Sequence, residues 1–282
     1  MIGETVRTCA IAALVALTAC HGDPVATTST PHTGSAGSDA IASSVADAAT
    51  AAVIPATSQQ LLTAIVPDWT STTAELQLWQ RDGAGWRALG EPWPGVVGRT
   101  GAAWGVGLHG TGAPAGRDGP FKHEGDGKSP AGAFAIRGLY GYTAAPPEGT
   151  HLAYTALADP WQCVDDPASR HYDEILDRRS VTVDWKSAEQ MRRPDVLYTW
   201  VVDLGHNPAR TPGDGSCIFL HVWNGPDSST VGCTAMDEDR LTHLVAALDP
   251  TASFVLLPRA EYDALAGAWR LPPRSRSAKV AP

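Results

Sequence analysis

The sequence of 282 residues has no apolar run long enough to cross a bilayer as a helix, and it is short of basic residues. Its longest apolar stretch, at the N-terminus, has about eleven residues, whereas a spanning helix needs about 20. Lys and Arg number 21 against 30 Asp and Glu, so the formal net charge is −9. An acidic chain without a basic patch repels nucleic-acid phosphates. We therefore expect no transmembrane helix and no nucleic-acid partner.

The sequence also lacks the spacings that gather metal ligands or hold a dinucleotide. A Gly-x-Gly-x-x-Gly pattern spans 105–110, but the glycines and proline of 111–116 cannot easily begin the helix that it requires. Neighbouring carboxylates such as Asp165 and Asp166 usually point apart, which favours a capped loop over a glycosidase pair. No His-x-His or His-Glu-x-x-His spacing joins the scattered histidines, namely His109, His123, His151, His171, His206 and His243. We expect no metal and no cofactor, with a zinc hydrolase kept as an alternative.

The N-terminus has the features of a secretion signal. Arg7 precedes the short apolar core, and Leu17-Thr-Ala-Cys20 resembles a bacterial lipoprotein box. That resemblance implies a signal peptide over 1–20 and acylation of Cys20, which would anchor the protein to a membrane without a spanning helix. His21 stands where some lipoproteins have aspartate, and by resemblance this favours the outer membrane. We expect a periplasmic, lipid-anchored protein, and an ordinary cleaved signal is the alternative.

Composition divides the rest of the chain into three parts. Residues 21–56 are rich in Ala, Ser and Thr and lack aromatic residues, which predicts a disordered tether. Residues 57–272 are long enough for one large domain, and 273–282 form a polar, basic tail. Short apolar runs split by Gly and Pro predict a mainly β domain. The expected elements are a hairpin over 75–86, strands at 93–97, 134–140, 197–204, 218–223 and 254–257, and helices at 237–248 and 260–269.

A histidine and a cysteine twelve residues apart are the best candidates for chemistry. His221 would end the buried strand of 218–223, and the turn-forming residues 224–229 lead the chain back to Cys233. An imidazole near a thiol can accept its proton, and the thiolate is the nucleophile. The helix after Cys233 would lower the thiol pKa, and backbone N–H groups near Gly232 and Cys233 could hold an oxyanion. The alternative is a histidine and a cysteine that only pack in the core.

These residues resemble the L,D-transpeptidase catalytic domain (the YkuD type), whose signature is a strand histidine, a loop and then Ser/Thr-His-Gly-Cys. Upstream, Lys122-His-Glu-Gly-Asp-Gly-Lys-Ser-Pro-Ala-Gly-Ala-Phe134 resembles that family's Lys-Arg-Glu-Gly-Asp-Gly segment. The resemblance covers roughly 74–257. It implies a β-sandwich of mixed sheets with Cys233 as nucleophile, His221 as base, and Thr230 and Gly232 in the active-site loop. The sequence departs at Val231, where the family has a second histidine, and at Ala235, where many members have an arginine.

The reaction implied by this resemblance is acyl transfer on peptidoglycan stem peptides. Cys233 would form a thioester as D-alanine leaves, and an amine of a second stem or of a protein lysine would then accept the acyl group. With water as acceptor the protein would be an L,D-carboxypeptidase. Two alternatives are a peptidoglycan-binding lipoprotein without catalysis and a papain-like amidase, in which the cysteine normally precedes the histidine.

Two further cysteines, Cys163 and Cys217, remain in the predicted domain. In an oxidising periplasm two spare thiols often pair. Cys217, however, lies on the His221 strand and could simply be buried, so the sequence leaves this disulfide open.

Overall fold

The computed structural model describes residues 52–274. The N-terminal prediction of a signal peptide with an acylated Cys20 lies outside these residues. The described elements are β1 (Gln60–Val66), β2 (Thr73–Asp82), β3 (Gly85–Val96), β4 (Ala102–Trp104), β5 (Val106–Gly107), β6 (Gly110–Thr111), β7 (Ser129–Gly141), β8 (Tyr154–Ala156), β9 (Trp161–Cys163), β10 (Ile175–Asp177), β11 (Glu189–Gln190), β12 (Trp200–Leu204), β13 (Phe219–Val222), β14 (Thr234–Met236), α1 (Glu238–Ala247), β15 (Ser253–Pro258) and α2 (Arg259–Trp269).

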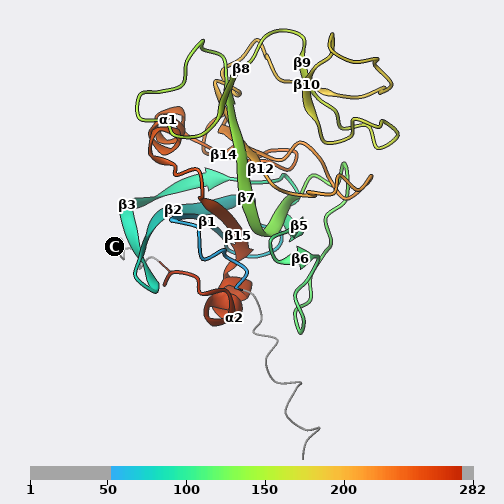
Figure 1. The fold of residues 1–282 in the computed structure, drawn as a ribbon. Helices are drawn as coiled ribbons and strands as arrows, with labels where there is room; N and C mark the ends of the chain where they lie inside the picture. Colours follow the sequence, from blue (N-terminus) through green and yellow to red (C-terminus); the bar gives the residue numbers. More distant parts are fainter. Residues whose placement is uncertain (1–51, 275–282) are drawn as a thin grey trace, which may run out of the picture. The chain divides into compact units, whose positions relative to one another are not determined.

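The main sheet closes on itself. Its strands run in the order β12-β13-β14-β3-β2-β1-β15-β7, and β7 pairs with β12 again. The prediction of a mainly β fold with mixed strand directions is confirmed, because β1–β15 and β13–β14 are parallel whereas β1–β2 and β12–β13 are antiparallel. Two separate stacked sheets were expected, and the structure has one barrel-like sheet instead. The reason is the length of β7, which reaches both β15 and β12 (Figure 1).

The predicted hairpin and helices are present. Asp82 pairs with Gly85 across the turn between β2 and β3, and Gly83 there has a positive φ of 57°, which suits glycine. Helix α1 begins after Asp237, whose side chain accepts hydrogen bonds from the N–H groups of Asp239 and Arg240. Helix α1 packs against β12 and β13, and α2 packs against β1 and β15. Both helices thereby cover apolar faces of the closed sheet.

The folded region begins earlier than residue 57, where the sequence placed the domain boundary. Ile54 is only 3% exposed and packs in the main hydrophobic core, so the predicted tether is shorter at this end. No helix among residues 52–274 is long and apolar enough to cross a membrane.

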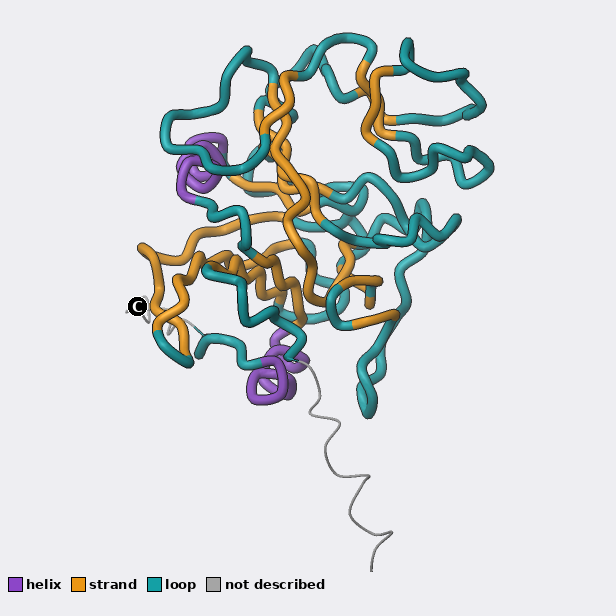
Figure 2. Tube along the Cα trace, viewed as in Figure 1, coloured by secondary structure: helices purple, strands orange, loops and turns teal. Residues whose placement is uncertain are grey.

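A long excursion between β7 and β12 is tied to the sheet by a disulfide. This segment, 142–199, carries the short strands β8–β11 and is otherwise mostly loop (Figure 2). Cys163 on β9 is bonded to Cys217, just before β13, so the bridge that the sequence left open is present. It holds the excursion beside the strand that carries His221.

Removing this disulfide should cost much of the stability of the domain. The bond closes a loop with a sequence separation of 54, for which chain entropy gives about 4 kcal/mol. Replacing Cys163 and Cys217 together with alanine should therefore lower the free energy of unfolding by about 4 kcal/mol. Urea denaturation followed by tryptophan fluorescence measures this change, with Cys233→Ala, which keeps the bridge, as control. A loss below about 1 kcal/mol would show that the disulfide hardly stabilises the domain.

Candidate active site

Cys233 ends the loop that leads into β14, and His221 is on the neighbouring parallel strand β13. His221 is in β13 and pairs with Ala235 of β14, and Cys233 immediately precedes β14. Cys233 packs in the same buried cluster as Tyr198, whose ring is edge-on to the ring of His221. Adjacent strands are about 4.8 Å apart and two residues rise about 6.6 Å, so the two Cα atoms lie roughly 8 Å apart. The fold thus brings together the residues that the sequence proposed as base and nucleophile.

In this structure the thiol and the imidazole are hydrogen-bonded to the backbone. The Cys233 Sγ atom accepts a hydrogen bond from the Phe219 N–H at 3.3 Å and donates to the Cys217 carbonyl at 3.4 Å. His221 Nδ1 lies 2.7 Å from the Val222 carbonyl, which fits the tautomer with its hydrogen on Nδ1. No hydrogen bond within residues 52–274 joins the imidazole to the thiol. This tautomer leaves Nε2 as the nitrogen that can accept a proton.

Burial keeps both groups neutral. It raises the pKa of the Cys233 thiol well above its usual range, and it lowers the pKa of the His221 imidazole to about 4. The sequence predicted a lowered thiol pKa from the following helix, and this was wrong in direction. Helix α1 begins only at Glu238, beyond the distance at which a helix dipole acts strongly, so burial dominates.

The segment before Cys233 is held by Thr230. The Thr230 hydroxyl donates to the Cys233 carbonyl at 2.6 Å and accepts from the Gly232 N–H at 3.1 Å. The Gly232 N–H, which the sequence offered as an oxyanion donor, is therefore engaged within the loop. A Cβ atom on Gly232 would lie 3.3 Å from both the Ile218 side chain and the Lys128 carbonyl, so a larger residue would press on these neighbours. Val231, between Thr230 and Gly232 in the sequence, is 64% exposed.

The upstream motif folds against the same loop. Ser129, in its second half, donates from its hydroxyl to the Cys233 carbonyl at 2.8 Å and accepts from the Gly98 N–H at 2.9 Å. At its start, Lys122 is buried and donates to Asp126 at 2.6 Å. The sequence marked this segment by its resemblance to the L,D-transpeptidase family but predicted no role for Ser129. The signal was present in the motif, yet only the tertiary structure shows which atom Ser129 reaches.

Cys233 lines a pocket of about 360 Å³. Its walls come from five separate parts of the chain: the segment after β3, the upstream motif, the 142–199 excursion, the residues just before β13 and the Cys233 loop. The lining residues are Arg99, Lys122, Glu124, Gly125, Asp165, Glu189, Ser216, Cys217, Ile218, Val231, Gly232 and Cys233. Asp165 is the part of the 161–169 segment that lines this pocket.

Tyr198 contacts both Glu189, which lines this pocket, and His221. Its ring is edge-on to the His221 ring at 5.2 Å between centroids, and its hydroxyl donates to Glu189. Burial raises the pKa of the Glu189 carboxyl, and the negative charge of that carboxylate helps to raise the pKa of Cys233. Tyr198 and Glu189 were missed from the sequence because no local pattern marks them.

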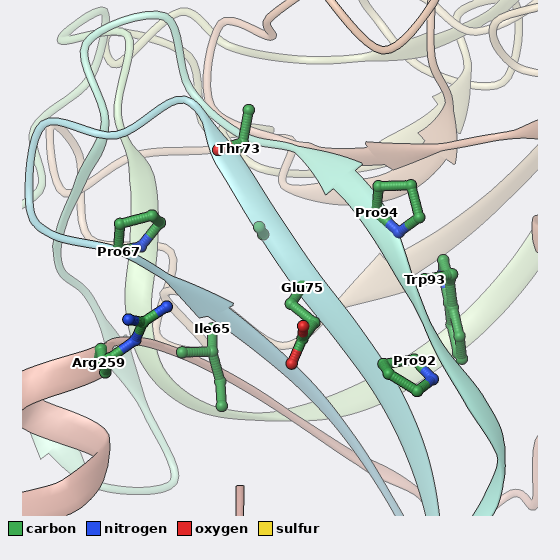
Figure 3. Close-up of a pocket in the computed structure, with 9 residues that line it drawn as sticks. Ile65, Pro67, Thr73, Glu75, Pro92, Trp93, Pro94 and Arg259 are labelled. Atoms are coloured by element: carbon green, nitrogen blue, oxygen red, sulfur yellow. The ribbon is translucent and has the colours of Figure 1, made fainter. Parts of the chain in front are cut away.

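Another hollow, of about 410 Å³, lies over β1–β3 beside the start of α2 (Figure 3). Figure 3 shows Glu75 and Arg259 there, among the prolines 67, 92 and 94. Its lining residues include neither cysteine nor histidine, so this hollow offers no nucleophile and base pair.

The structure weakens the remaining alternatives that the sequence left open. The glycine pattern at 105–110 forms the β5–β6 hairpin, and residues 111–116 directly after it contain no helix. Asp166 accepts from the N–H groups of Ala168 and Lys186, which is the predicted loop cap. Among residues 52–274, one set of ligand atoms lies close enough for a metal, those of Cys163, Asp173 and Cys217, but both sulfurs are in the disulfide.

Acid should destabilise the protein through His221. Its pKa is about 4 when folded, below the ordinary value near 6.5, so its contribution to stability is present above pH 6.5 and is lost as the pH falls toward 4. Relative to His221→Gln, the wild type should lose roughly 3 kcal/mol of unfolding free energy between pH 7 and pH 4. Urea denaturation of both proteins at the two pH values measures the difference between their unfolding free energies. The other titrating groups are present in both proteins, so their effects cancel in this difference. An unchanged difference would mean that His221 titrates normally.

No protein-family model, curated protein or solved structure matches this chain. The pocket itself is therefore the ground for a functional proposal.

Proposed function

We propose that this protein is a cysteine acyltransferase of the L,D-transpeptidase type that acts on peptidoglycan stem peptides through a thioester on Cys233. The observation that carries the proposal is the convergence of two distant sequence motifs on one pocket. Ser129 from the upstream motif donates to the carbonyl of Cys233 in the other motif, and both motifs line the cavity. The sheet is closed and not divided into the two expected layers, and the contact between the two motifs is present in it.

The chemistry would start from a neutral thiol and a neutral imidazole. As the stem peptide enters, His221 Nε2 takes the thiol proton and the sulfur bonds to the carbonyl carbon next to the terminal D-alanine. The carbon–nitrogen bond then breaks, and the imidazolium returns its proton to the amine of the departing D-alanine. The resulting thioester passes its acyl group to an amine of another stem or of a protein lysine, or to water in a carboxypeptidase. The raised pKa of the thiol means that the thiolate forms only during this attack.

The substitution at Ala235 changes how the substrate is held. Ala235 is fully buried and pairs with Val96 of β3, so this position in the sheet offers no free space for an arginine. A carboxylate on the substrate must then be recognised by another residue.

A second candidate is a peptidoglycan-binding lipoprotein without catalysis. The absence of a thiol–imidazole hydrogen bond within residues 52–274 and the raised thiol pKa favour it. Hydrogen bonds of catalytic groups are often long before substrate binds, so we place the enzyme first.

The proposal includes a periplasmic location with a lipid anchor on Cys20, and His21 favours the outer membrane. The Cys163–Cys217 disulfide supports an oxidising compartment, since such bonds rarely persist where thiols are kept reduced. Metabolic labelling with a fatty-acid analogue, compared between the full chain and Cys20→Ser, tests the anchor.

Incubation of the purified domain with tetrapeptide muropeptides tests the enzymatic proposal. Mass spectrometry should find an acyl adduct on the peptide that contains Cys233 and should identify the product. A cross-linked dimer indicates transpeptidation, and a tripeptide with free D-alanine indicates carboxypeptidation. Tight binding of the muropeptide with neither adduct nor product would support the non-catalytic candidate.

A further inference from the structure

Among residues 52–274, one positively charged side chain that lines the Cys233 pocket has no hydrogen-bond or ion-pair partner. Arg99 follows β3 and lies beside the active-site loop, because its backbone N–H donates to the Thr230 carbonyl at 2.8 Å. Its side chain is exposed and crosses Gly127, where a Cβ atom would come within 3.1 Å of the arginine Cγ and Nε atoms. Within residues 52–274, no hydrogen bond or ion pair engages the guanidinium.

The other charged side chains of the pocket are all satisfied by neighbours in the protein. Each is paired with a hydroxyl or an opposite charge: Lys122 with Asp126, Glu124 with Tyr172 and Ser216, Asp165 with Ser187, and Glu189 with Tyr198. A guanidinium has several donors in a planar fork that fits a carboxylate. Arg99 is therefore the lining group that is both charged and available to a ligand.

We propose that Arg99 is the specificity-determining residue that binds a carboxylate of the peptide entering the Cys233 pocket. The carboxylates of Glu124, Asp165 and Glu189 line the same cavity, so a ligand group with a single negative charge is favoured over a phosphate dianion. Val231, exposed beside Arg99 on the loop, offers an apolar contact next to that charge. The peptide as ligand rests on the proposed function, whereas the preference for an anion does not.

Alkylation of Cys233 by two small reagents of different charge tests this role without any substrate. Iodoacetate carries a carboxylate, and iodoacetamide is its neutral counterpart. Because burial raises the pKa of the Cys233 thiol, only a small fraction of it is thiolate at about pH 9.5 and alkylation is slow, whereas arginine keeps its charge. Arg99→Ala should slow alkylation by iodoacetate about tenfold and leave the rate with iodoacetamide within about twofold, because only the anion feels the lost charge. Arg99→Lys should restore most of the iodoacetate rate.

Arg87, on β3 itself, provides a matched control. It is exposed on β3 opposite Gln80, and nine residues of strand from Arg87 to Val96 span about 30 Å, so it lies far from the pocket. Arg87→Ala should change neither rate. Equal slowing of both reagents by Arg99→Ala, or no change in their ratio, would overturn the proposed role of Arg99.

The muropeptide assay separates this role from the function itself. With tetrapeptide substrates that end in a free carboxylate or in an amide, Arg99→Ala should raise KM for the free acid about tenfold and leave KM for the amide nearly unchanged. If the wild type forms no adduct with either substrate, the proposed function fails, while the alkylation ratio still decides whether Arg99 recognises an anion.

Discussion

Replacing Cys233 with alanine is expected to abolish the acyl adduct and to reduce turnover of tetrapeptide muropeptides by roughly 10⁴-fold or more. The thiol supplies the atom that bonds to the substrate carbonyl, and no other described cysteine is free to replace it, since Cys163 and Cys217 are bonded to each other. Mass spectrometry of the protein and of the muropeptide products measures both effects.

The Cys163→Ala, Cys217→Ala double variant is the control for Cys233→Ala, because it removes two sulfurs and keeps the free thiol. Under conditions where it is folded, it should still form the adduct on Cys233. The thermal midpoint of Cys233→Ala should be measured beside its activity to show that the protein is folded. Undiminished turnover by the Cys233→Ala protein would contradict the proposed mechanism.

Replacing His221 with glutamine is expected to lower turnover by about 10²–10⁴-fold, the usual contribution of a general base. Glutamine has a similar size but cannot take the thiol proton. At pH 7 the imidazole is neutral because burial lowers its pKa to about 4, so the substitution removes no charge. The loss of activity should therefore be much larger than the loss of stability, which steady-state rates and urea denaturation measure together.

His206→Gln is the matched control for His221→Gln. His206 is also buried with a pKa lowered to about 4, and its Nε2 atom lies 2.9 Å from the Asp214 carbonyl. Neither histidine is a lining residue of the Cys233 pocket, but His221 is on β13, the strand that pairs with β14 directly after Cys233, whereas His206 is on neither strand. Turnover of the folded His206→Gln protein should stay near that of the wild type. Equal effects of the two substitutions on turnover and stability would show that His221 is only a core residue.

Local sequence patterns predicted the elements that local forces determine. Asp237 precedes α1 as expected, because its side chain can satisfy the first free N–H groups of the helix. The turn at 82–85 joins β2 and β3 as its glycines suggested. His221 is in a buried strand, as its apolar neighbours predicted. Each of these features depends on residues close together in the chain.

The closure of the sheet was not predicted, because it depends on contacts between distant residues. A short apolar run predicted a strand at 134–140, but it does not say that this strand extends over Ser129–Gly141 and pairs with both β12 and β15. The strands of a sandwich and of a closed sheet have the same local pattern, and pairing decides between them.

The sequence by itself determined the residue types at the candidate site: a cysteine, a strand histidine and the threonine and glycine of a tight loop. Tertiary structure decided their environment. It placed Ser129 and Arg99 beside the loop, bonded Cys163 to Cys217, and buried Cys233 so that its pKa rises. The reason is physical: residue identity sets which bonds a group can make, whereas pKa and recognition depend on the water, charges and partners that folding brings near it.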